Sequence, residues 1–291
     1  MRYFLILNPA SCGGKSEQYF DAIHQTLKKH GFEYDYEYTK SLNHAYQLSN
    51  EANKKGYDVI VAVGGDGTIN RAINGFYDSM GNRISQAKFG VIYTGTSPDF
   101  CKSYQIPIYI EGALQALIKG QVRNIEIGKI EFSDAVRYFA CCANIGLGAM
   151  LANHANSGIR KVYGDFFGTL ISLIKTLRQY KPIDVSINGV LYNHTYNISI
   201  GKTYYIASGL KISHELSEHE NKFYVLPVQN SILATIYKMY TGKRLSVTYL
   251  SEIEIKGVGA VEFDGDEGGT LPCKISCAEN LEVIYERKGD Y

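Results

Sequence analysis

The sequence has almost no net charge, no long apolar run and no cysteine pair with metal-binding spacing. Its 30 Lys and Arg residues against 29 Asp and Glu residues leave a net charge of +1, which argues against a protein that binds nucleic acid over a broad surface. No apolar run reaches the roughly 18 residues that a membrane-spanning helix requires. The apolar start at residues 3–7 is too short for a signal peptide, so we expect a cytoplasmic protein.

The six cysteines fit that compartment. Cys141 and Cys142 are neighbours that cannot readily bridge, and the other four show no paired CxxC spacing. We therefore expect reduced, mostly buried thiols. Cys12 and Cys101 lie in or beside loops that we interpret below as phosphate-binding, and we expect them to be sensitive to oxidation.

The stretch from Asp58 to Asn70 reads as a buried strand that runs directly into a helix. Apolar, mostly β-branched residues are followed by three glycines around Asp66 and then by a helical apolar pattern. Ligands bind beyond the carboxyl ends of strands in open α/β sheets, and glycines let backbone N–H groups approach phosphate. Asp66 would repel phosphate unless a divalent cation lay between them. The alternative is a tight turn with Asp66 as the helix N-cap.

Two other loops follow predicted strands in the same half of the chain. Residues 8–15 follow the first strand and supply backbone donors together with Ser11 and Lys15, a plausible phosphate cradle. Residues 94–96 follow the strand Lys88–Tyr93 and carry threonine hydroxyls, which can donate to phosphate or ribose oxygens. We expect these loops to meet at one edge of the sheet.

The order of elements predicts two domains of different class. Strands and helices alternate up to a helix at 111–120, which predicts a doubly wound, Rossmann-like α/β domain with a parallel sheet. From Gln121 onward the pattern changes to serial strands, including a hairpin with Asn188-Gly189 as its turn. This predicts an antiparallel β-sandwich domain. We place the α/β domain at 1–122 and the β-sandwich domain at 123–291.

An acidic segment near the end of the chain is a second candidate for chemistry. Asp264, Asp266 and Glu267 place three carboxylates within four residues after a predicted strand. A general base must lie within hydrogen-bond reach of the proton that it accepts, and carboxylates also bind divalent cations. The segment is therefore either a source of base and metal ligand or an acidic hairpin tip.

Four segments, in this order, resemble motifs of the diacylglycerol kinase and sphingosine kinase family within the NAD-kinase-like superfamily. Asn8–Gly13 is similar to the NPxSG opening, Gly64–Thr68 to GGDGT, Thr94–Phe100 to GTxNDF, and Asp264–Asp266 to DGE. The resemblance extends over most of the chain and is strongest toward the soluble bacterial lipid kinases. It implies a kinase that depends on ATP and Mg²⁺ and phosphorylates a hydroxyl of diacylglycerol or a related lipid.

The resemblance also assigns site residues. The expected metal ligands are Asp66 and Asp264, and the expected catalytic residues are Asp66, Asp264, Asp266 and Glu267. The expected nucleotide-binding residues come from the three loops and from one basic pair: Asn8, Pro9, Ser11, Gly13, Lys15, Gly64, Gly65, Asp66, Gly67, Thr68, Asn70, Thr94, Gly95, Thr96, Arg160 and Lys161.

A lipid partner at the membrane surface is expected to contact the second domain. Candidates for a lipid groove are Tyr163, Phe166, Phe167 and Leu170. The basic side chains Lys175, Arg178 and Lys181 would favour peripheral contact with anionic lipid. A homodimer through exposed sheet edges is left open.

Departures from the family pattern keep other functions open. Ser97-Pro98 stands where the family has Gly-Asn, and Arg71 stands where the family has Glu. Asp266 stands where the DGE motif has its Glu. Glu220 aligns with an acidic turn that holds a structural metal in the family, so that metal is undecided. The alternatives are an NAD kinase, a catalytically inactive nucleotide-binding regulator and a kinase for a non-lipid alcohol.

Overall fold

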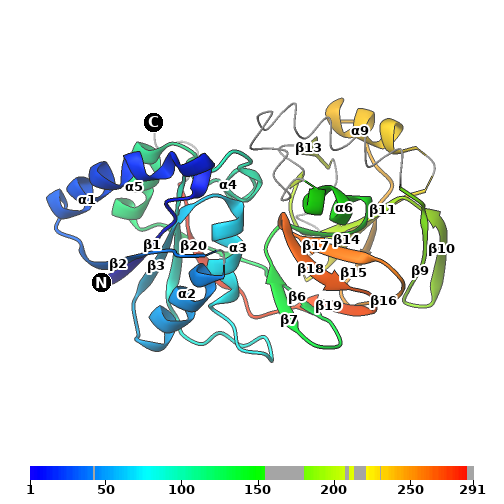
Figure 1. Cartoon of the computed structure of the whole chain (residues 1–291), viewed down its shortest axis with the longest axis horizontal. Helices are drawn as coiled ribbons and strands as arrows, with labels where there is room; N and C mark the ends of the chain where they lie inside the picture. The colour runs from blue at the N-terminus through cyan, green and yellow to red at the C-terminus, as the bar shows by residue number, and fades with distance from the viewer. Residues whose placement is uncertain (42, 155–179, 207–209, 213–220, 230, 287–291) are drawn as a thin grey trace. The chain divides into compact units, whose positions relative to one another are not determined.

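The computed structural model describes residues 1–41, 43–154, 180–206, 210–212, 221–229 and 231–286 (Figure 1). They form two compact units. The first contains residues 1–127 and 278–286, and the second contains residues 128–206 and 210–277 within these described ranges.

The first unit is built on a six-stranded sheet in the order β2-β1-β3-β4-β20-β5. All neighbouring pairs are parallel except β20 with β5, which is antiparallel. The strands are β1 (Arg2–Leu7), β2 (Glu33–Tyr38), β3 (Val59–Gly64), β4 (Lys88–Tyr93), β5 (Val122–Ile125) and β20 (Leu281–Ile284). All six residues of β3 are buried, as a strand covered on both faces requires.

Helices cover both faces of this sheet (Figure 1). One face packs its apolar side chains, such as Leu5 and Val61, against α1 and α5 in a single cluster. On the other face α2 and α3 pack against each other and against β1 and β3. The helices are α1 (Phe20–Lys29), α2 (His44–Lys54), α3 (Asp66–Asn74), α4 (Asp99–Tyr104) and α5 (Ile110–Lys119). The predicted doubly wound fold is confirmed.

The second unit contains two six-stranded sheets with antiparallel pairing. Their orders are β10-β9-β16-β19-β6-β7 and β15-β14-β11-β8-β17-β18. The strands of the first are β6 (Gly128–Glu131), β7 (Val136–Phe139), β9 (Ile183–Ile187), β10 (Val190–Thr195), β16 (Ile253–Gly257) and β19 (Cys273–Cys277). Those of the second are β8 (Cys142–Gly146), β11 (Asn197–Gly201), β14 (Phe223–Val228), β15 (Thr248–Leu250), β17 (Ala260–Phe263) and β18 (Asp266–Thr270).

The two sheets enclose one core. Ile130 and Val185 from one sheet share a buried cluster with Ile145 and Val225 from the other, which is the arrangement of a β-sandwich. The unit also has a two-stranded sheet, β12 (Tyr205–Ile206) with β13 (Leu210–Lys211), and the helices α6 (Leu147–His154) and α9 (Ile232–Tyr240). The predicted sandwich is confirmed. None of the described helices has the length and apolar composition to span a bilayer.

The structure differs from the predicted domain limits of 1–122 and 123–291 in two respects. The division falls between residues 127 and 128, and residues 278–286 return to the first unit. The physical reason lies in β20, where Leu281 and Val283 are 0% exposed between β4 and β5. These apolar side chains fill an interior position of the first sheet.

Several elements are short or interrupted. Two 3₁₀ turns, η1 (Ser11–Gly14) and η2 (Ser16–Tyr19), precede α1. The stretch 136–146 contains two strands, β7 and β8, and the stretch 245–262 contains β15, β16 and part of β17. The hairpin turn is as predicted, because Asn188 and Gly189 have φ values of 47° and 83°, the signs that a type I′ turn requires.

Candidate functional site

Three loops meet beyond the carboxyl ends of β1, β3 and β4. These strands are neighbours in the sheet, and the hydrogen-bond ladder continues into the loops. The N–H of Asn8 donates to Val63 O at 2.9 Å, and the N–H of Thr94 donates to Gly64 O at 3.0 Å. The structure therefore brings together the predicted segments 8–15, 64–68 and 94–96.

Polar side chains hold these loops to one another. The Asn8 amide donates to Thr68 Oγ1 at 2.8 Å, and its Oδ1 accepts from the N–H of Ala10 at 3.0 Å. Ser11 Oγ donates to Thr94 O at 3.3 Å, and the hydroxyls of Ser16 and Thr94 lie 2.8 Å apart. The loops are therefore held together by the side chains of Asn8, Thr68 and Thr94, in addition to any contact that these residues make with a ligand.

Two glycines permit a backbone-to-backbone approach between the loops. A Cβ on Gly95 would lie 2.6 Å from Gly65 Cα, and one on Gly65 would lie 3.2 Å from Gly95 Cα. In the first loop, Cys12 and Gly13 adopt left-handed conformations with φ of 52° and 65° after right-handed Ala10. Successive residues of this kind turn their N–H groups toward one concavity, which suits an anion.

Asp66 is the first residue of α3 and its carboxylate is held by a tyrosine. The helix N-cap is Gly65, without a side-chain cap, so the alternative of Asp66 as N-cap is wrong. Asp66 Oδ2 accepts from the Tyr93 hydroxyl at 3.0 Å, and that hydroxyl accepts from the N–H of Ser97 at 2.7 Å. Burial and the charge of Asp66 raise the pKa of Tyr93 far above its ordinary value. Tyr93 therefore stays a neutral donor.

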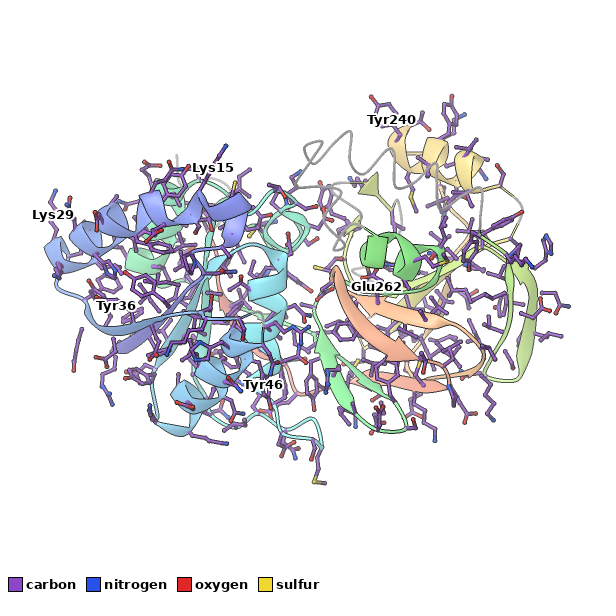
Figure 2. All side chains as sticks on the ribbon, viewed as in Figure 1. Lys15, Lys29, Tyr36, Tyr46, Tyr240 and Glu262 are labelled. Carbon is purple, nitrogen blue, oxygen red and sulfur yellow. The ribbon has the colours of Figure 1, made fainter. Side chains whose placement is uncertain are left out.

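Other predicted residues of the first unit take different positions. Gly13, Lys15 and Thr96 are exposed, as Figure 2 shows for Lys15, whereas Pro9 and Gly67 are half-buried. Asn70 is only 1% exposed within α3, where its carbonyl accepts from Asn74. Cys101 is fully buried, and burial together with Asp66 raises the pKa of its thiol. The expected oxidation sensitivity of Cys101 is therefore wrong, because oxidation requires an accessible thiolate.

In the second unit, Asp264 is anchored by backbone donors. Its carboxylate accepts from the N–H groups of Ala140, Cys141 and Cys142 at 2.7, 2.9 and 3.0 Å. Its own N–H donates to Cys142 O at 3.0 Å. An ionised carboxylate has about four lone-pair sites, so these bonds use most of them. Asp264 fixes the β17–β18 turn to the break between β7 and β8.

Asp266 and Glu267 follow that turn at the start of β18. Their backbones pair with Phe263 and Glu262 of β17, and the structure describes only the backbone of these two residues. Asp66 and Asp264, the predicted metal ligands, come from different units. Among the residues described, His, Cys, Asp and Glu side chains form no group of three that could hold a metal ion.

A buried row of polar side chains beside the acidic turn was not predicted from the sequence. Glu262, labelled in Figure 2, is 6% exposed, and its Oε2 accepts from the N–H of Gly265 at 3.0 Å. Its Oε1 accepts from the Asn144 amide, and Asn144 Oδ1 accepts from Ser199 Oγ. The row follows the register Glu262↔Asn144↔Ser199 across β17, β8 and β11.

This row occupies the sheet face opposite the sandwich core. Ala143 and Ile145 face the core, so Asn144 between them faces outward, and α6 packs over β8 and β17. Strand alternation was the signal available in the sequence, but it indicates a polar face without showing that a helix covers it. Tyr93 was missed for a similar reason, since it reads as an ordinary last residue of a strand.

Some predicted residues lie outside the described part of the chain. These are the basic pair Arg160 and Lys161, the groove candidates Tyr163, Phe166, Phe167 and Leu170, the cations Lys175 and Arg178, and Glu220.

Comparisons with known proteins agree with this arrangement. Residues 2–130 match the family model described as the diacylglycerol kinase catalytic domain. A diacylglycerol kinase of Staphylococcus aureus strain bovine RF122 / ET3-1 is 27% identical over 304 residues, covering 96% of this chain and 91% of the relative. The diacylglycerol kinase of strain MRSA252 is 28% identical over 298 residues with the same coverage.

A solved structure extends the likeness to the whole fold. A diacylglycerol kinase from Bacillus anthracis str. Sterne superimposes with a TM-score of 0.71 at 18% identity, covering 98% of this chain and 97% of that one. The family model ends at residue 130, close to the division between the two units at 127 and 128. The resemblance to the diacylglycerol kinase family is thereby confirmed. Over most of its length the chain is similar to diacylglycerol kinases, which are kinases with an alcohol acceptor, and residues 2–130 match the model of their catalytic domain.

Proposed function

We propose that this chain transfers the γ-phosphoryl group of Mg-ATP to a hydroxyl of a diacylglycerol-like lipid. The observation that carries the proposal is the meeting of three glycine-containing loops around Asp66 at the sheet edge. Gly65 and Gly95 lie so close together that neither position has room for a Cβ. The backbone of both loops is therefore free of side chains where a phosphate would bind. The match to the diacylglycerol kinase family model and the similarity to diacylglycerol kinases support the acceptor class.

The residues present fit a nucleotide phosphate. The N–H groups of Gly13 and of the first turn of α3 would hold phosphate oxygens, and Lys15 would add a positive charge. Asp66 would hold Mg²⁺, because Mg²⁺ prefers carboxylate oxygens and usually binds through one or two of them plus phosphates. When bound, Mg²⁺ neutralises charge on the transferred phosphoryl group. Tyr93 keeps the Asp66 carboxylate in one orientation through their 3.0 Å hydrogen bond.

The acidic turn supplies the proposed base. The base must accept a proton from the acceptor hydroxyl within hydrogen-bond reach, and Asp266 and Glu267 are the two candidates. Asp264 and Glu262 hold the turn through backbone N–H groups, which leaves them to position it. Asp264 as base or metal ligand stays a prediction, in which its carboxylate would act while three of about four lone-pair sites already accept backbone N–H groups.

A labelled-phosphate assay tests the proposal. ATP labelled at the γ-phosphate is offered with Mg²⁺ and a panel of diacylglycerol, sphingoid base, phosphatidylglycerol and NAD. Label is expected in diacylglycerol and is expected to vanish in Asp66→Ala. Asp21→Ala, at an exposed position of α1, serves as the matched control. Asp266→Asn and Glu267→Gln then identify the base, since only one should abolish transfer.

Two outcomes would overturn the proposal. Label in NAD alone would establish an NAD kinase. ATP binding without transfer to any acceptor would favour the nucleotide-binding regulator, for which the Ser97-Pro98 departure and the engaged N–H of Ser97 are the motivating observations.

A further inference from the structure

Helix α9 presents a stripe of large side chains to solvent. Leu233, Tyr237 and Tyr240 are 69%, 57% and 84% exposed, and their spacing of four and three residues places them on one face of the helix. Figure 2 shows Tyr240 extending away from α9. Met239 is 6% exposed and joins a core cluster with Leu226. One face of α9 therefore anchors the helix, while another is left for a partner.

Three cations lie on α9 or shortly after it in the sequence. Lys238, Lys243 and Arg244 are exposed, and the sequence has no Asp or Glu from residue 221 to residue 251. The chain as a whole is nearly balanced, with 30 basic and 29 acidic residues, so this stretch concentrates positive charge. The ion pairs formed among the described residues do not include these three cations. Lys243 Nζ lies 5.3 Å from the centre of the Tyr237 ring.

We propose that the α9 surface, defined as Leu233, Tyr237, Lys238, Tyr240, Lys243 and Arg244, docks on an anionic lipid bilayer. Tyrosines place an apolar ring and a polar hydroxyl at the level of the lipid head groups. A short amphipathic helix with lysines beside leucine and aromatic residues lies in that interface. The inference rests on the proposed lipid substrate, which a bilayer would present.

The lysines of the α9 surface favour a bilayer over a protein as its partner. Lysine is depleted at protein–protein interfaces, whereas two of the three cations here are lysines. Near an anionic membrane each cation strengthens binding about fivefold, so removal of three is expected to weaken it roughly a hundredfold. Vesicles without anionic lipid should bind weakly for the same reason.

Sedimentation with sucrose-loaded vesicles tests the inference on the full chain. Vesicles of phosphatidylcholine with phosphatidylglycerol are compared with vesicles of phosphatidylcholine alone. One variant combines Lys238→Gln, Lys243→Gln and Arg244→Gln, and a second combines Tyr237→Ser and Tyr240→Ser. The matched control removes three exposed lysines from α1 and α2: Lys28→Gln, Lys29→Gln and Lys54→Gln. Thermal unfolding checks that every variant is folded.

The charge variant is expected to bind anionic vesicles roughly a hundredfold more weakly than the wild type. The tyrosine variant is expected to bind them at least about tenfold more weakly, and the control variant should change little. Transfer to a short-chain diacylglycerol dispersed without vesicles is measured in parallel. It should be unchanged in both variants, because the α9 surface is separate from the residues proposed for chemistry. Failure of transfer in the wild type would count against the proposed function, whereas vesicle binding would still decide the role of α9.

Three results would overturn the inference. The first is equal binding of wild type and both variants to anionic vesicles. The second is a control variant that loses as much binding as the charge variant. The third is unchanged vesicle binding together with loss of self-association in analytical ultracentrifugation, which would assign the α9 surface to a second copy of the chain.

Discussion

The Tyr93 hydroxyl donates to the Asp66 carboxylate at 3.0 Å and accepts from the N–H of Ser97 at 2.7 Å. It therefore links the end of β4, the start of α3 and the loop after β4 through one oxygen atom. Because Asp66 is the proposed Mg²⁺ ligand, loss of this hydroxyl should change how the carboxylate is oriented.

Tyr93→Phe is expected to lower kcat/KM for ATP by about tenfold to a hundredfold, since hydrogen bonds to charged groups contribute roughly 1.5–3 kcal/mol. Steady-state kinetics with varied ATP and Mg²⁺ measure the effect. Tyr57→Phe is the matched control, because the Tyr57 hydroxyl donates to Asp35 at 2.6 Å in the same unit, away from the three loops. Equal loss in both variants would show that the Tyr93 bond is only structural.

Gly95→Ala is expected to weaken nucleotide binding and to destabilise the first unit by about 1–3 kcal/mol. The added Cβ would lie 2.6 Å from Gly65 Cα, so the two loops must separate. Gly90→Ala in β4 places a Cβ 2.8 Å from Leu117 Cδ2 in the core. It should lower stability comparably while leaving ATP affinity unchanged, as calorimetry and urea unfolding can show. Unaltered ATP affinity in Gly95→Ala would contradict a phosphate site between the loops.

Asp264→Ala is expected to reduce the free energy of unfolding by roughly 3 kcal/mol or more, because three backbone N–H groups lose their acceptor. Asp266→Asn should instead lower the transfer rate with little change in stability if Asp266 is the base. Urea unfolding and the labelled-phosphate assay separate the two effects. A stable Asp264→Ala protein without activity would restore Asp264 as a catalytic residue or metal ligand.

Stability should fall as pH rises above about 9. Burial, with a smaller contribution from Asp66, raises the pKa of Cys101 above its ordinary 9.0, and burial raises the pKa of Cys273 to about 12. The unfolded chain releases these protons at ordinary values while the folded chain retains them, so the stabilisation is complete below pH 9 and is lost above it. The slope is about 1.4 kcal/mol per pH unit for each group.

Urea unfolding between about pH 8 and pH 10 measures this slope. The double variant Cys101→Ala and Cys273→Ala should show a flatter profile, whereas Cys12→Ala, at a half-buried position, is the comparison. An identical slope in the double variant would show that other groups control the alkaline transition.

The loops around Asp66 could be predicted from sequence because their signals are local. A buried run such as Val59–Gly64 ends in glycines, and a helical pattern begins at once. Strand β4 has the predicted limits Lys88–Tyr93. Because β1, β3 and β4 are parallel neighbours, the loops that follow them meet at one edge of the sheet.

The partners of Asp66 and Glu262 could not be predicted, because they depend on register between distant strands. Glu262 meets Asn144 across 118 residues of sequence, and nothing near either residue specifies that pairing. Whether the polar face of β17 is exposed to solvent or covered depends on where α6 packs, and that packing is likewise a tertiary property. The short apolar run of β20 gave no local sign of the sheet that it joins.

The position of β20 determines the order in which the protein can fold during synthesis. Leu281–Ile284 lie between β4 and β5, and the N–H of Ala278 donates to Ile127 O at 2.8 Å, so the chain leaves and re-enters the first unit at one place. The sheet of the first unit therefore lacks an interior strand until the strands of the sandwich have been synthesised. A nascent chain arrested before residue 281 should therefore present an unfinished sheet to chaperones and proteases, although the loops 8–15, 64–68 and 94–96 have already been synthesised.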